Sequence, residues 1–417
     1  MTDPQFDALI VGAGPAGSTA AILLARAGWS VALLERAEFP RRKVCGECIA
    51  ATNLPLLDAL GVGGEFAALA GPQLQRVALW CGAQSASARL PAFASGSYPW
   101  GRALDRAHLD QLLLERARAS GVIVLQPWVA ESLGGRPGGF TCVARRLPGR
   151  ERQVVSASIA IAAHGTGALP SERAQPAGRA QRARNSGALL AFKADYRDVR
   201  LEPGTLPVLC FRGGYGGIVI ADAGRATLAF CIRADRLEAA RRLRPGASAG
   251  AAVEAVLRAE CAPLRTCLAG ATRVTEWLAT GPLRTGVHLG RPGGALRIGN
   301  AAGEAHPIIG EGISMAIQSA WLLSRELLRS QPRLPQLMSA SASADCYRAL
   351  QRRYAREWRA LFAPRLRLAA CFARAAMYPV PTAAFARLCR IAPPVLTTCA
   401  QWSGKVLRSV HPPEYPA

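Results

Sequence analysis

The sequence predicts an α/β protein in which a parallel-sheet domain is interleaved with an α+β domain and followed by a C-terminal helical region. Near the N-terminus, a buried strand, a glycine-rich turn, a helix and a second strand follow one another within about thirty residues. Another strand that ends in a glycine turn lies in the last third of the chain. Strand-like alternation separates the two elements, and the final stretch is mainly helical and basic.

The chain has 417 residues, half of them apolar, which suits two or three packed domains with a sizeable core. We expect residues 170–185 to form a connection and residues 331–343 a linker. The first domain is predicted to comprise residues 1–72, 101–169 and 276–330, the second or substrate domain residues 73–100 and 170–275, and the C-terminal basic helical region residues 331–417.

The formal net charge is +23, and nearly all of it comes from arginine, since Lys43, Lys193 and Lys405 are the only lysines. Two interpretations remain open. One is an arginine-rich codon usage, and the other is attraction to an anionic partner such as membrane lipid, an acidic carrier protein or nucleic acid. Nucleic acid is the least favoured, because no recognition motif or basic-aromatic interleaving is present.

Targeting and redox signals indicate a cytoplasmic location. No basic stretch precedes an apolar run at the N-terminus, and no window approaches the roughly 20 apolar residues of a membrane helix. The twelve cysteines lack the rhythm of a disulfide scaffold and suit reduced thiols.

The first glycine turn has a physical reason at each of its glycine positions. Gly12 allows a tight turn, Gly14 a close approach of the backbone to a pyrophosphate, and Gly17 close helix–strand packing. The pyrophosphate would then lie on the N-terminus of the helix that begins after the turn. Glu35, at the end of the second strand, is placed to accept hydrogen bonds from a ribose. The predicted binding segment is Gly12, Gly14, Pro15, Ala16, Gly17, Glu35 and Arg36.

The second glycine element favours FAD over NAD. Residues 298–303 form a strand and turn, and residues 306–316 form a glycine-flexed loop that opens a helix predicted over 312–330. The N-terminus of this helix can stabilise negative charge on a reduced isoalloxazine ring, which an NAD domain does not need.

These elements together resemble the FAD-dependent oxidoreductases that include aromatic-ring hydroxylases, flavin halogenases and geranylgeranyl reductases. The resemblance implies a Rossmann-like FAD-binding domain and a flavin-nucleotide contact from Arg102 in the Arg102–Asp105 stretch. Asn300 stands where the family carries an Asp that bonds the ribityl chain, and His164 stands where hydroxylases carry an Asp. The further FAD contacts that it implies are Gly299, Asn300, Pro307, Gly310, Gly312 and Ile313.

The segment after the second strand, residues 39–48, resembles the Lys-x-Cys-Gly stretch that passes close to the isoalloxazine in geranylgeranyl-reductase-like enzymes. Lys43 can contact phosphate or an acidic substrate. Cys45, near cations, is a candidate for a lowered pKa and a role as thiolate or proton donor, or it packs against the ring. Glu47 either transfers protons or is a solvated loop acid. Cys45 and Cys48 form a CxxC that is neither a zinc site nor in a thioredoxin pattern, and no metal is expected.

Three further residues are candidates for the substrate side. His306, in the flavin loop, is either a proton shuttle or structural. Residues 213–220 and 228–231 predict a hairpin, in which Tyr215 and Phe230 contact substrate or belong to the core.

The C-terminal helices carry many cations interleaved with Trp358, Leu361, Phe362, Leu366, Phe372 and Phe385. This pattern fits a helical cap that closes the substrate cavity. The alternative is a face that lies peripherally on an anionic membrane.

Our first hypothesis is an FAD-dependent monooxygenase of a small aromatic, polyketide-like or apolar secondary metabolite, with NADPH or NADH as electron donor. The alternative is a reductase or dehydrogenase of an isoprenoid or lipid double bond. A third hypothesis is a flavin-binding protein without turnover.

Overall fold

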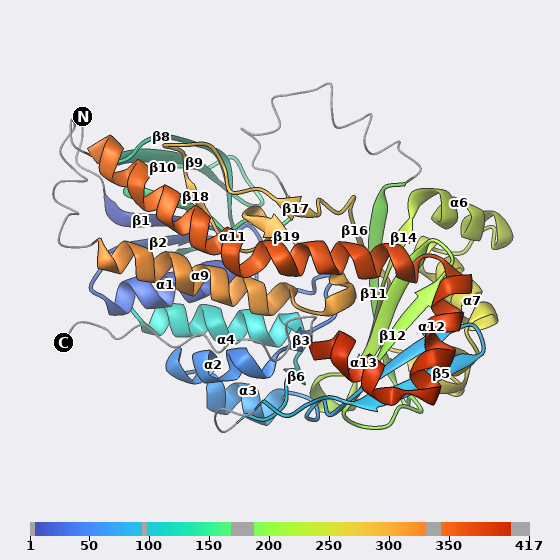
Figure 1. Cartoon of the computed structure of the whole chain (residues 1–417). Helices are drawn as coiled ribbons and strands as arrows, with labels where there is room; N and C mark the ends of the chain where they lie inside the picture. The colour runs from blue at the N-terminus through green and yellow to red at the C-terminus, as the bar shows by residue number, and fades with distance from the viewer. Residues whose placement is uncertain (1–4, 94–97, 168–186, 331–342, 402–417) are drawn as a thin grey trace.

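The computed structural model describes residues 5–93, 98–167, 187–330 and 343–401 (Figure 1). The connection predicted at residues 170–185 and nearly all of the linker predicted at residues 331–343 lie outside these residues, as does Lys405. Figure 1 shows two lobes, with a long C-terminal helix that runs along both. The fold class that the sequence predicts is confirmed: a parallel sheet with helices forms one lobe and a largely antiparallel sheet the other.

The first sheet has the strand order β7-β2-β1-β10-β9-β8, with β18 paired to β10. Strands β7, β2, β1, β10 and β18 are parallel to their partners, whereas β8 and β9 extend β10 as an antiparallel meander. The central strands read as continuous apolar runs because both faces are covered. The strands are β1 (Phe6–Val11), β2 (Val31–Leu34), β7 (Ile123–Leu125), β8 (Trp128–Arg136), β9 (Gly139–Arg146), β10 (Arg152–Ala162) and β18 (Leu296–Arg297).

Helices stack in a layer against this sheet (Figure 1). The helix α1 contacts both α4 and α9, and their apolar side chains form one core with the sheet. Consequently, segments from both ends of the chain and its middle complete a single domain. The helices of this lobe are α1 (Pro15–Arg26), α2 (Leu54–Ala59), α3 (Gly63–Leu69), α4 (Arg106–Ala119) and α9 (Gly312–Arg329).

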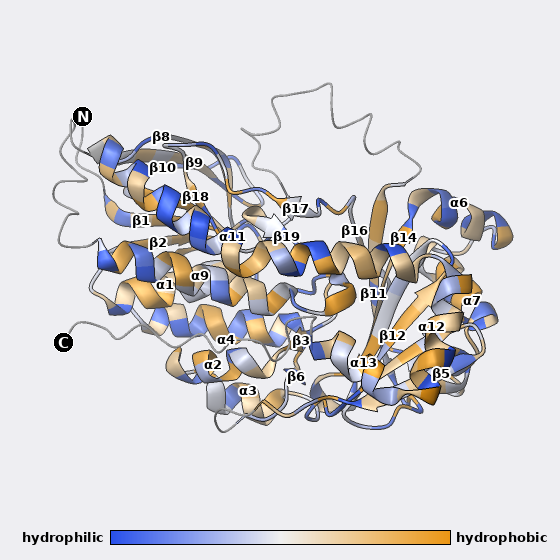
Figure 2. Cartoon of the chain, in the orientation of Figure 1, coloured by the Kyte–Doolittle hydropathy of each residue, from blue (hydrophilic) through white to orange (hydrophobic). Residues whose placement is uncertain are grey.

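The second sheet has the order β15-β11-β14-β13-β12-β4-β5, with β16 paired to β11. The predicted hairpin is confirmed as the antiparallel pair β13–β14. Figure 2 shows that β11 and β12 are rich in hydrophobic residues. The strands are β4 (Arg76–Cys81), β5 (Gln84–Arg89), β11 (Leu189–Arg197), β12 (Thr205–Phe211), β13 (Gly214–Ile220), β14 (Ala226–Arg233), β15 (Thr272–Arg273) and β16 (Leu278–Thr280).

The strand-like alternation expected between the two glycine elements does not hold for one part of residues 186–275. Three helices, α6 (Ala234–Leu243), α7 (Ala249–Glu260) and α8 (Ala262–Cys267), lie there, and buried side chains of all three pack in one core with the outer face of the second sheet. Alanine, leucine and arginine dominate them, and these are good helix formers. Helical propensity therefore outweighs the short-range alternation.

The C-terminal region bridges the two lobes. The helix α11 (Ser343–Ala376) buries Tyr347, Tyr354 and Trp358 in the first core and Ala373 in the core of the second lobe. It is followed by α12 (Pro379–Ile391) and α13 (Pro393–Ala400). Figure 2 shows hydrophilic and hydrophobic stretches alternating along α11, as expected of a helix with one buried stripe.

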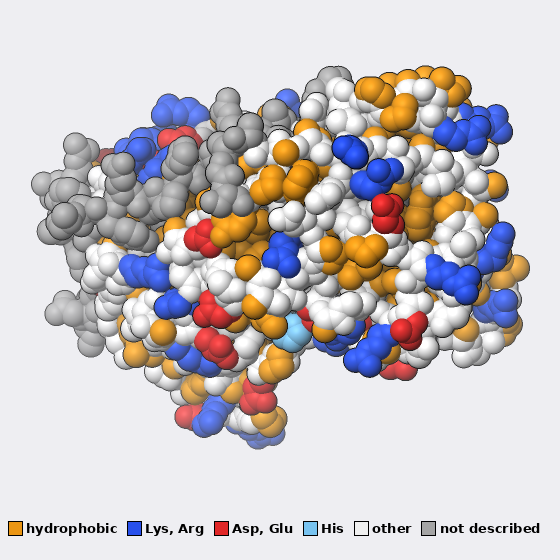
Figure 3. Space-filling model, turned by 90° about the horizontal axis from the view of Figure 1, so that it is seen from below, with side chains coloured by type: hydrophobic (Ala, Val, Ile, Leu, Met, Phe, Trp, Pro, Cys, Tyr) orange, Lys and Arg blue, Asp and Glu red, His pale blue; other side chains and the backbone are white. Residues whose placement is uncertain are grey.

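This packing bears on the membrane interpretation. Trp358, Phe362 and Leu366 are at most 7% exposed and belong to the core, so these three side chains do not form a membrane-facing surface. In the described part of the chain, no helix has both the length and the hydropathy needed to cross a bilayer. On the face seen in Figure 3, basic side chains are spread over the surface among acidic ones and do not gather in one patch.

Short elements complete the connections. Among them, β3 pairs with β6, and β17 pairs with β19. They are β3 (Cys48–Ile49), β6 (Arg102–Ala103), β17 (Gly286–Val287), β19 (Gly303–Glu304) and the 3₁₀ turns η1 (Ala51–Asn53), η3 (Asp222–Gly224), η4 (Gly299–Ala301) and η5 (Pro307–Ile309).

Candidate functional site

The glycine turn between β1 and α1 is sterically closed to larger residues. Gly12 adopts φ 107°, and a Cβ atom there would lie 2.6 Å from the carbonyl oxygen of Ala163. A Cβ atom at Gly17 would lie 1.8 Å from the carbonyl oxygen of Gly12. A Cβ atom at Gly14, in contrast, would lie 3.6 Å from Arg106 Nη2, which is an ordinary contact distance. This position is therefore open, and it faces a cation. The turn is therefore tightly packed at its two ends and open in the middle.

The N-terminus of α1 presents an anion-binding environment. Its N-cap residue, Gly14, provides no side-chain cap, and the first turn contains no acidic residue. Burial and the nearby charges of Arg106 and Arg41 lower the pKa of Lys43 to about 8. Arg106 thus lies at a helix end with unsatisfied N–H groups, and Lys43 and Arg41 lie within its electrostatic reach, which suits a pyrophosphate.

The resemblance implied a flavin-nucleotide contact from Arg102, but the arginine that lies at this turn is Arg106. The Arg102 guanidinium donates to the carbonyl oxygens of Gly71, Ala67 and Ala70, at the C-terminal end of α3. All three of its nitrogens are used there, so the structure assigns Arg102 a structural role. Arg106, which we did not predict, is held by a bidentate pair with Asp110 at 2.8 Å and lies over Gly14. The signal was present, since Arg106 opens the predicted helix.

Glu35 lies at the end of β2 beside the glycine turn. Its carboxylate accepts hydrogen bonds from the backbone N–H groups of Ala13 at 2.9 Å and Ala37 at 3.0 Å. It is 5% exposed, whereas the neighbouring Arg36 is exposed. Glu35 is thus fixed against the turn, and its predicted ribose contact stays a prediction.

The second glycine element packs directly on the first. Gly299 has φ 59°, and a Cβ atom there would lie 3.0 Å from Cβ of Ala16. The side chain of Asn300 donates to Thr166 Oγ1 and to Glu304 Oε1, both at 3.2 Å. The tertiary structure therefore brings Ala16 and Gly299, which are far apart in sequence, to one site.

The flavin loop and the Lys43–Cys48 segment also meet. A Cβ atom at Gly310, which has φ 64°, would lie 3.7 Å from Cβ of Cys48. Pro307 and Gly312 are exposed, and Ile313 is buried in the core. The α9 helix begins at Gly312 without a side-chain cap, so its N–H groups are available to a ring or anion beside this loop.

Glu47 is the centre of a buried network between the two lobes. It is fully buried and has φ 62°, which is uncommon for a residue with a side chain. Its carboxylate accepts hydrogen bonds from Lys193 Nζ, from Thr227 Oγ1 at 3.4 Å and from the backbone N–H of Arg106 at 3.4 Å. The expectation of a solvated loop acid is therefore wrong, because packing against the second sheet excludes water.

Lys193 is a functional candidate that sequence reasoning missed. Its ammonium is fully buried and lies 2.9 Å from Asp105 Oδ2 and 3.6 Å from Asp195 Oδ1. A lone lysine inside an apolar strand, in a chain with only three lysines, was the available signal. Buried charges of this kind are retained when they are paired.

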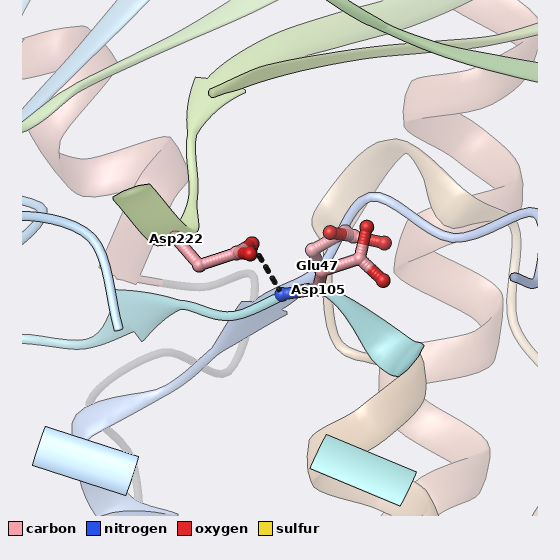
Figure 4. A group of neighbouring side chains, drawn as sticks. All are labelled: Glu47, Asp105 and Asp222. Atoms are coloured by element: carbon pink, nitrogen blue, oxygen red, sulfur yellow. Dashed lines mark hydrogen bonds between the residues drawn. The ribbon is translucent and has the colours of Figure 1, made fainter. Parts of the chain in front are cut away.

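Figure 4 shows the Glu47 and Asp105 carboxylates close together, with Asp222 bonded to the backbone N–H of Asp105 at 3.2 Å. These three acids lie close enough to ligate a metal ion. Lys193 Nζ, however, donates to both Glu47 and Asp105, so a cation of the chain already compensates their charge.

Glu47 can hold a proton at neutral pH. Burial raises the pKa of Glu47 to about 8 despite the neighbouring ammonium, since Asp105 and Asp195 share the same cation. This makes Glu47 a buried acid beside the Lys43–Cys48 segment.

The thiolate expected at Cys45 is not supported. Burial raises the pKa of Cys45 above its ordinary value, more strongly than the nearby charge of Arg106 lowers it. Its sulfur accepts a hydrogen bond from the N–H of Glu47 at 3.3 Å. No disulfide joins Cys45 and Cys48.

His306 lines a cavity of about 720 Å³ to which both lobes and the end of α11 contribute. Its Nδ1 atom is 3.0 Å from the hydroxyl of Tyr215, which is 1% exposed. Burial and the charge of Arg374 lower the pKa of His306, so the ring is neutral near pH 7. Because Nδ1 faces Tyr215, Nε2 is the ring nitrogen left for a cavity ligand.

Phe230 does not belong to this cavity. It is 2% exposed and stacks on Phe192 with ring centroids 5.3 Å apart, and it also contacts Trp277. Tyr215 and Phe230 belong to different cores, because alternate residues of paired strands point to opposite faces of the sheet. The substrate interpretation of Phe230 is therefore wrong, and its core interpretation holds.

Three features fit FAD and define an FAD-binding oxidoreductase fold. They are the closed glycine turn, the cations near the N-terminus of α1 and the second uncapped helix end, at α9. The chain belongs to the FAD binding domain family, whose sequence profile matches residues 5–331.

Curated relatives resemble shorter parts of the chain. It is 37% identical over 118 residues to tryptophan 2-halogenase of Chondromyces crocatus, covering 28% of this chain and 22% of the relative. It is 34% identical over 123 residues to menaquinone reductase of Mycobacterium tuberculosis, covering 30% of this chain and 29% of the relative. The similarity thus spans less than one third of either relative's length.

Solved structures share the fold over most of the chain. CmlS, a flavin-dependent halogenase, has a TM-score of 0.69 at 23% identity, covering 87% of this chain and 63% of that chain. PqsL of P. aeruginosa, in complex with 2-aminobenzoylacetate, has a TM-score of 0.67 at 17% identity, covering 91% and 98%.

Proposed function

We propose that the protein is an FAD-dependent monooxygenase that oxygenates a small, largely apolar molecule held in the cavity beside His306. The observation that carries this proposal is the position of the cavity, which reaches the residue directly before the Pro307–Gly312 loop. A cavity of about 720 Å³ is large enough for a small organic substrate. FAD, when bound, supplies the redox chemistry.

The chain's own residues divide the remaining tasks. The α1 N-terminus, with Arg106 and Lys43, binds the pyrophosphate, and the α9 N-terminus stabilises negative charge on the ring. His306, neutral and oriented by Tyr215, is placed to hold or move a proton at Nε2. Burial raises the pKa of Glu47 to about 8, so this acid can hold a second proton near neutral pH.

Halogenation is a second candidate, favoured by relatives named tryptophan 2-halogenase and 1H-pyrrole-2-carbonyl-[peptidyl-carrier protein] chlorinase. The relative named menaquinone reductase similarly favours the reductase hypothesis. These three reactions differ in what they consume, so one experiment separates them.

The FAD-loaded protein is incubated aerobically with apolar aromatic substrates, with and without chloride or bromide, and products are analysed by mass spectrometry. Electrons are supplied either by NADPH or NADH directly or by FADH₂ from a separate flavin reductase. We expect oxygen uptake and products heavier by one oxygen atom, independent of halide. Products that carry halogen would instead establish halogenation. Hydrogen addition to an isoprenoid double bond in a parallel anaerobic incubation, without any oxygenated product in air, would establish the reductase and refute the proposal.

His306→Gln tests the proton role, with His288→Gln as a control outside the cavity. We expect the His306 variant to keep FAD binding, and its loss of turnover to be greatest where the wild-type ring is neutral. An unchanged pH–rate profile would exclude His306 from proton transfer.

A further inference from the structure

The cavity beside His306 has an unusual balance of charge on its walls. Among the described residues that line it, four are arginines, Arg212, Arg233, Arg236 and Arg374, and one is an acid, Asp235. Asp235 is already engaged by Arg233 through two hydrogen bonds of 3.0 Å. Within the described part of the chain, no carboxylate forms an ion pair with Arg212, Arg236 or Arg374.

The walls that present these arginines are tied together by backbone hydrogen bonds. The N–H of Gly213 donates to the carbonyl of Met377 at 3.0 Å, which joins the β12–β13 turn to the end of α11. The N–H of Arg233 donates to the carbonyl of Gly213 at 2.9 Å, which joins the same turn to β14. The segments that carry these arginines are therefore hydrogen-bonded to one another without a ligand, so the site is preorganised.

Gly213 also makes room for the aliphatic stem of Arg236. It has φ 74°, and a Cβ atom there would lie 2.3 Å from Cγ of Arg236. Any side chain at this position would displace the Arg236 stem from the turn. The glycine thus lets Arg236 lie across the turn at the wall of the cavity.

Apolar side chains line another part of the wall. Leu189, Leu283 and Met377 line it together with His306. A ligand that fits these walls has an anionic group for the arginines and an apolar body for the remaining surface. Guanidinium groups match carboxylate and phosphate oxygens in a bidentate manner.

We infer that this cavity binds an amphipathic organic anion, whose carboxylate or phosphate lies on Arg212, Arg236 and Arg374 while its apolar body reaches His306. This inference rests on the proposed function, because it names the chemical class of that enzyme's substrate. Binding the anion would offset the charge of Arg374, which lowers the pKa of His306.

Binding without turnover tests the inference separately from the proposed reaction. The full chain loaded with FAD is titrated calorimetrically with naphthoate, its neutral counterpart naphthamide, and naphthyl phosphate. We expect an anion to bind roughly tenfold or more tightly than the amide, with an affinity that falls as salt increases. Tighter binding of naphthoate would identify a carboxylate ligand, and tighter binding of naphthyl phosphate a phosphate ligand.

Variants assign the preference to the cavity. Arg236→Gln and Arg374→Gln are expected each to weaken anion binding roughly tenfold and to leave naphthamide binding unchanged. Arg236→Lys should recover part of the loss. Arg241→Gln, an equal change of charge at an exposed position outside the cavity, is the matched control. Equal affinity for acid and amide, or an equal loss in the Arg241 variant, would overturn the inference. Anion binding by a protein that never oxygenates a substrate would refute the proposed function alone.

Discussion

Replacing Lys193 by methionine should destabilise the protein in a manner that depends on pH. Methionine keeps much of the volume of the side chain but removes the ammonium that Glu47, Asp105 and Asp195 share. Breaking a buried ion pair by removing one partner costs about 3–5 kcal/mol. For a 417-residue chain that unfolds as one unit, about 1 kcal/mol corresponds to roughly 1 °C in the unfolding temperature, so we expect a decrease of roughly 3–6 °C at pH 8.

The pH dependence distinguishes electrostatics from packing. Without the ammonium, the buried carboxyl groups bind protons more tightly in the folded than in the unfolded state, so stability falls as pH rises. At pH 5 the remaining acids are more readily protonated, and the deficit of the variant should be smaller than at pH 8. Adding Glu47→Gln to Lys193→Met removes one of the acids and should recover part of the loss.

The assay is thermal unfolding of the FAD-loaded protein followed by tryptophan fluorescence at both pH values. Arg242→Met, which breaks an exposed pair with Glu238, is the control and should have little effect. The reasoning would be refuted if Lys193→Met unfolded like the control at pH 8. It would also fail if the deficit were equal at both pH values.

Further predictions concern the cofactor site and the core. Gly17→Ala should abolish FAD binding in a flavin absorbance titration, because its Cβ would lie 1.8 Å from the carbonyl oxygen of Gly12; retained affinity would contradict the closed turn. FAD affinity should decrease as pH rises through about 8, where Lys43 loses its proton, and this dependence should disappear in Lys43→Met. Protonated Glu47 should contribute its full stability below about pH 4.5, and this contribution should be lost as pH rises through about 8. The free energy of unfolding should fall by roughly 1.4 kcal/mol per pH unit between these values. Glu47→Gln should flatten this slope in urea unfolding. Trp358→Ala should cost about 3–5 kcal/mol, because the ring is 1% exposed in the core of the first lobe, and a smaller loss in urea unfolding would mean that the core collapses around the missing ring.

Local rules made part of the site predictable. The spacing of Gly12, Gly14 and Gly17 follows from backbone geometry and close packing, which act over a few residues and are visible in the sequence. The same holds for Glu35 at a strand end and for the glycine-flexed loop before α9. Strand and helix periodicity likewise indicated the α/β class. The helices at residues 234–267 were missed because short alternating patterns do not distinguish a half-buried strand from a helix rich in alanine and arginine.

The sequence by itself thus determined the fold class, the dinucleotide turn and the second helix N-terminus, since each rests on local geometry. Only the tertiary structure decided that Arg106, and not Arg102, lies over Gly14, because a guanidinium's partner depends on which carbonyl groups surround it. It also decided that the pKa of Glu47 is raised and that Lys193 pairs with buried acids. These residues lie on separate segments, and the free energy of a buried charge depends on neighbours that only packing brings together.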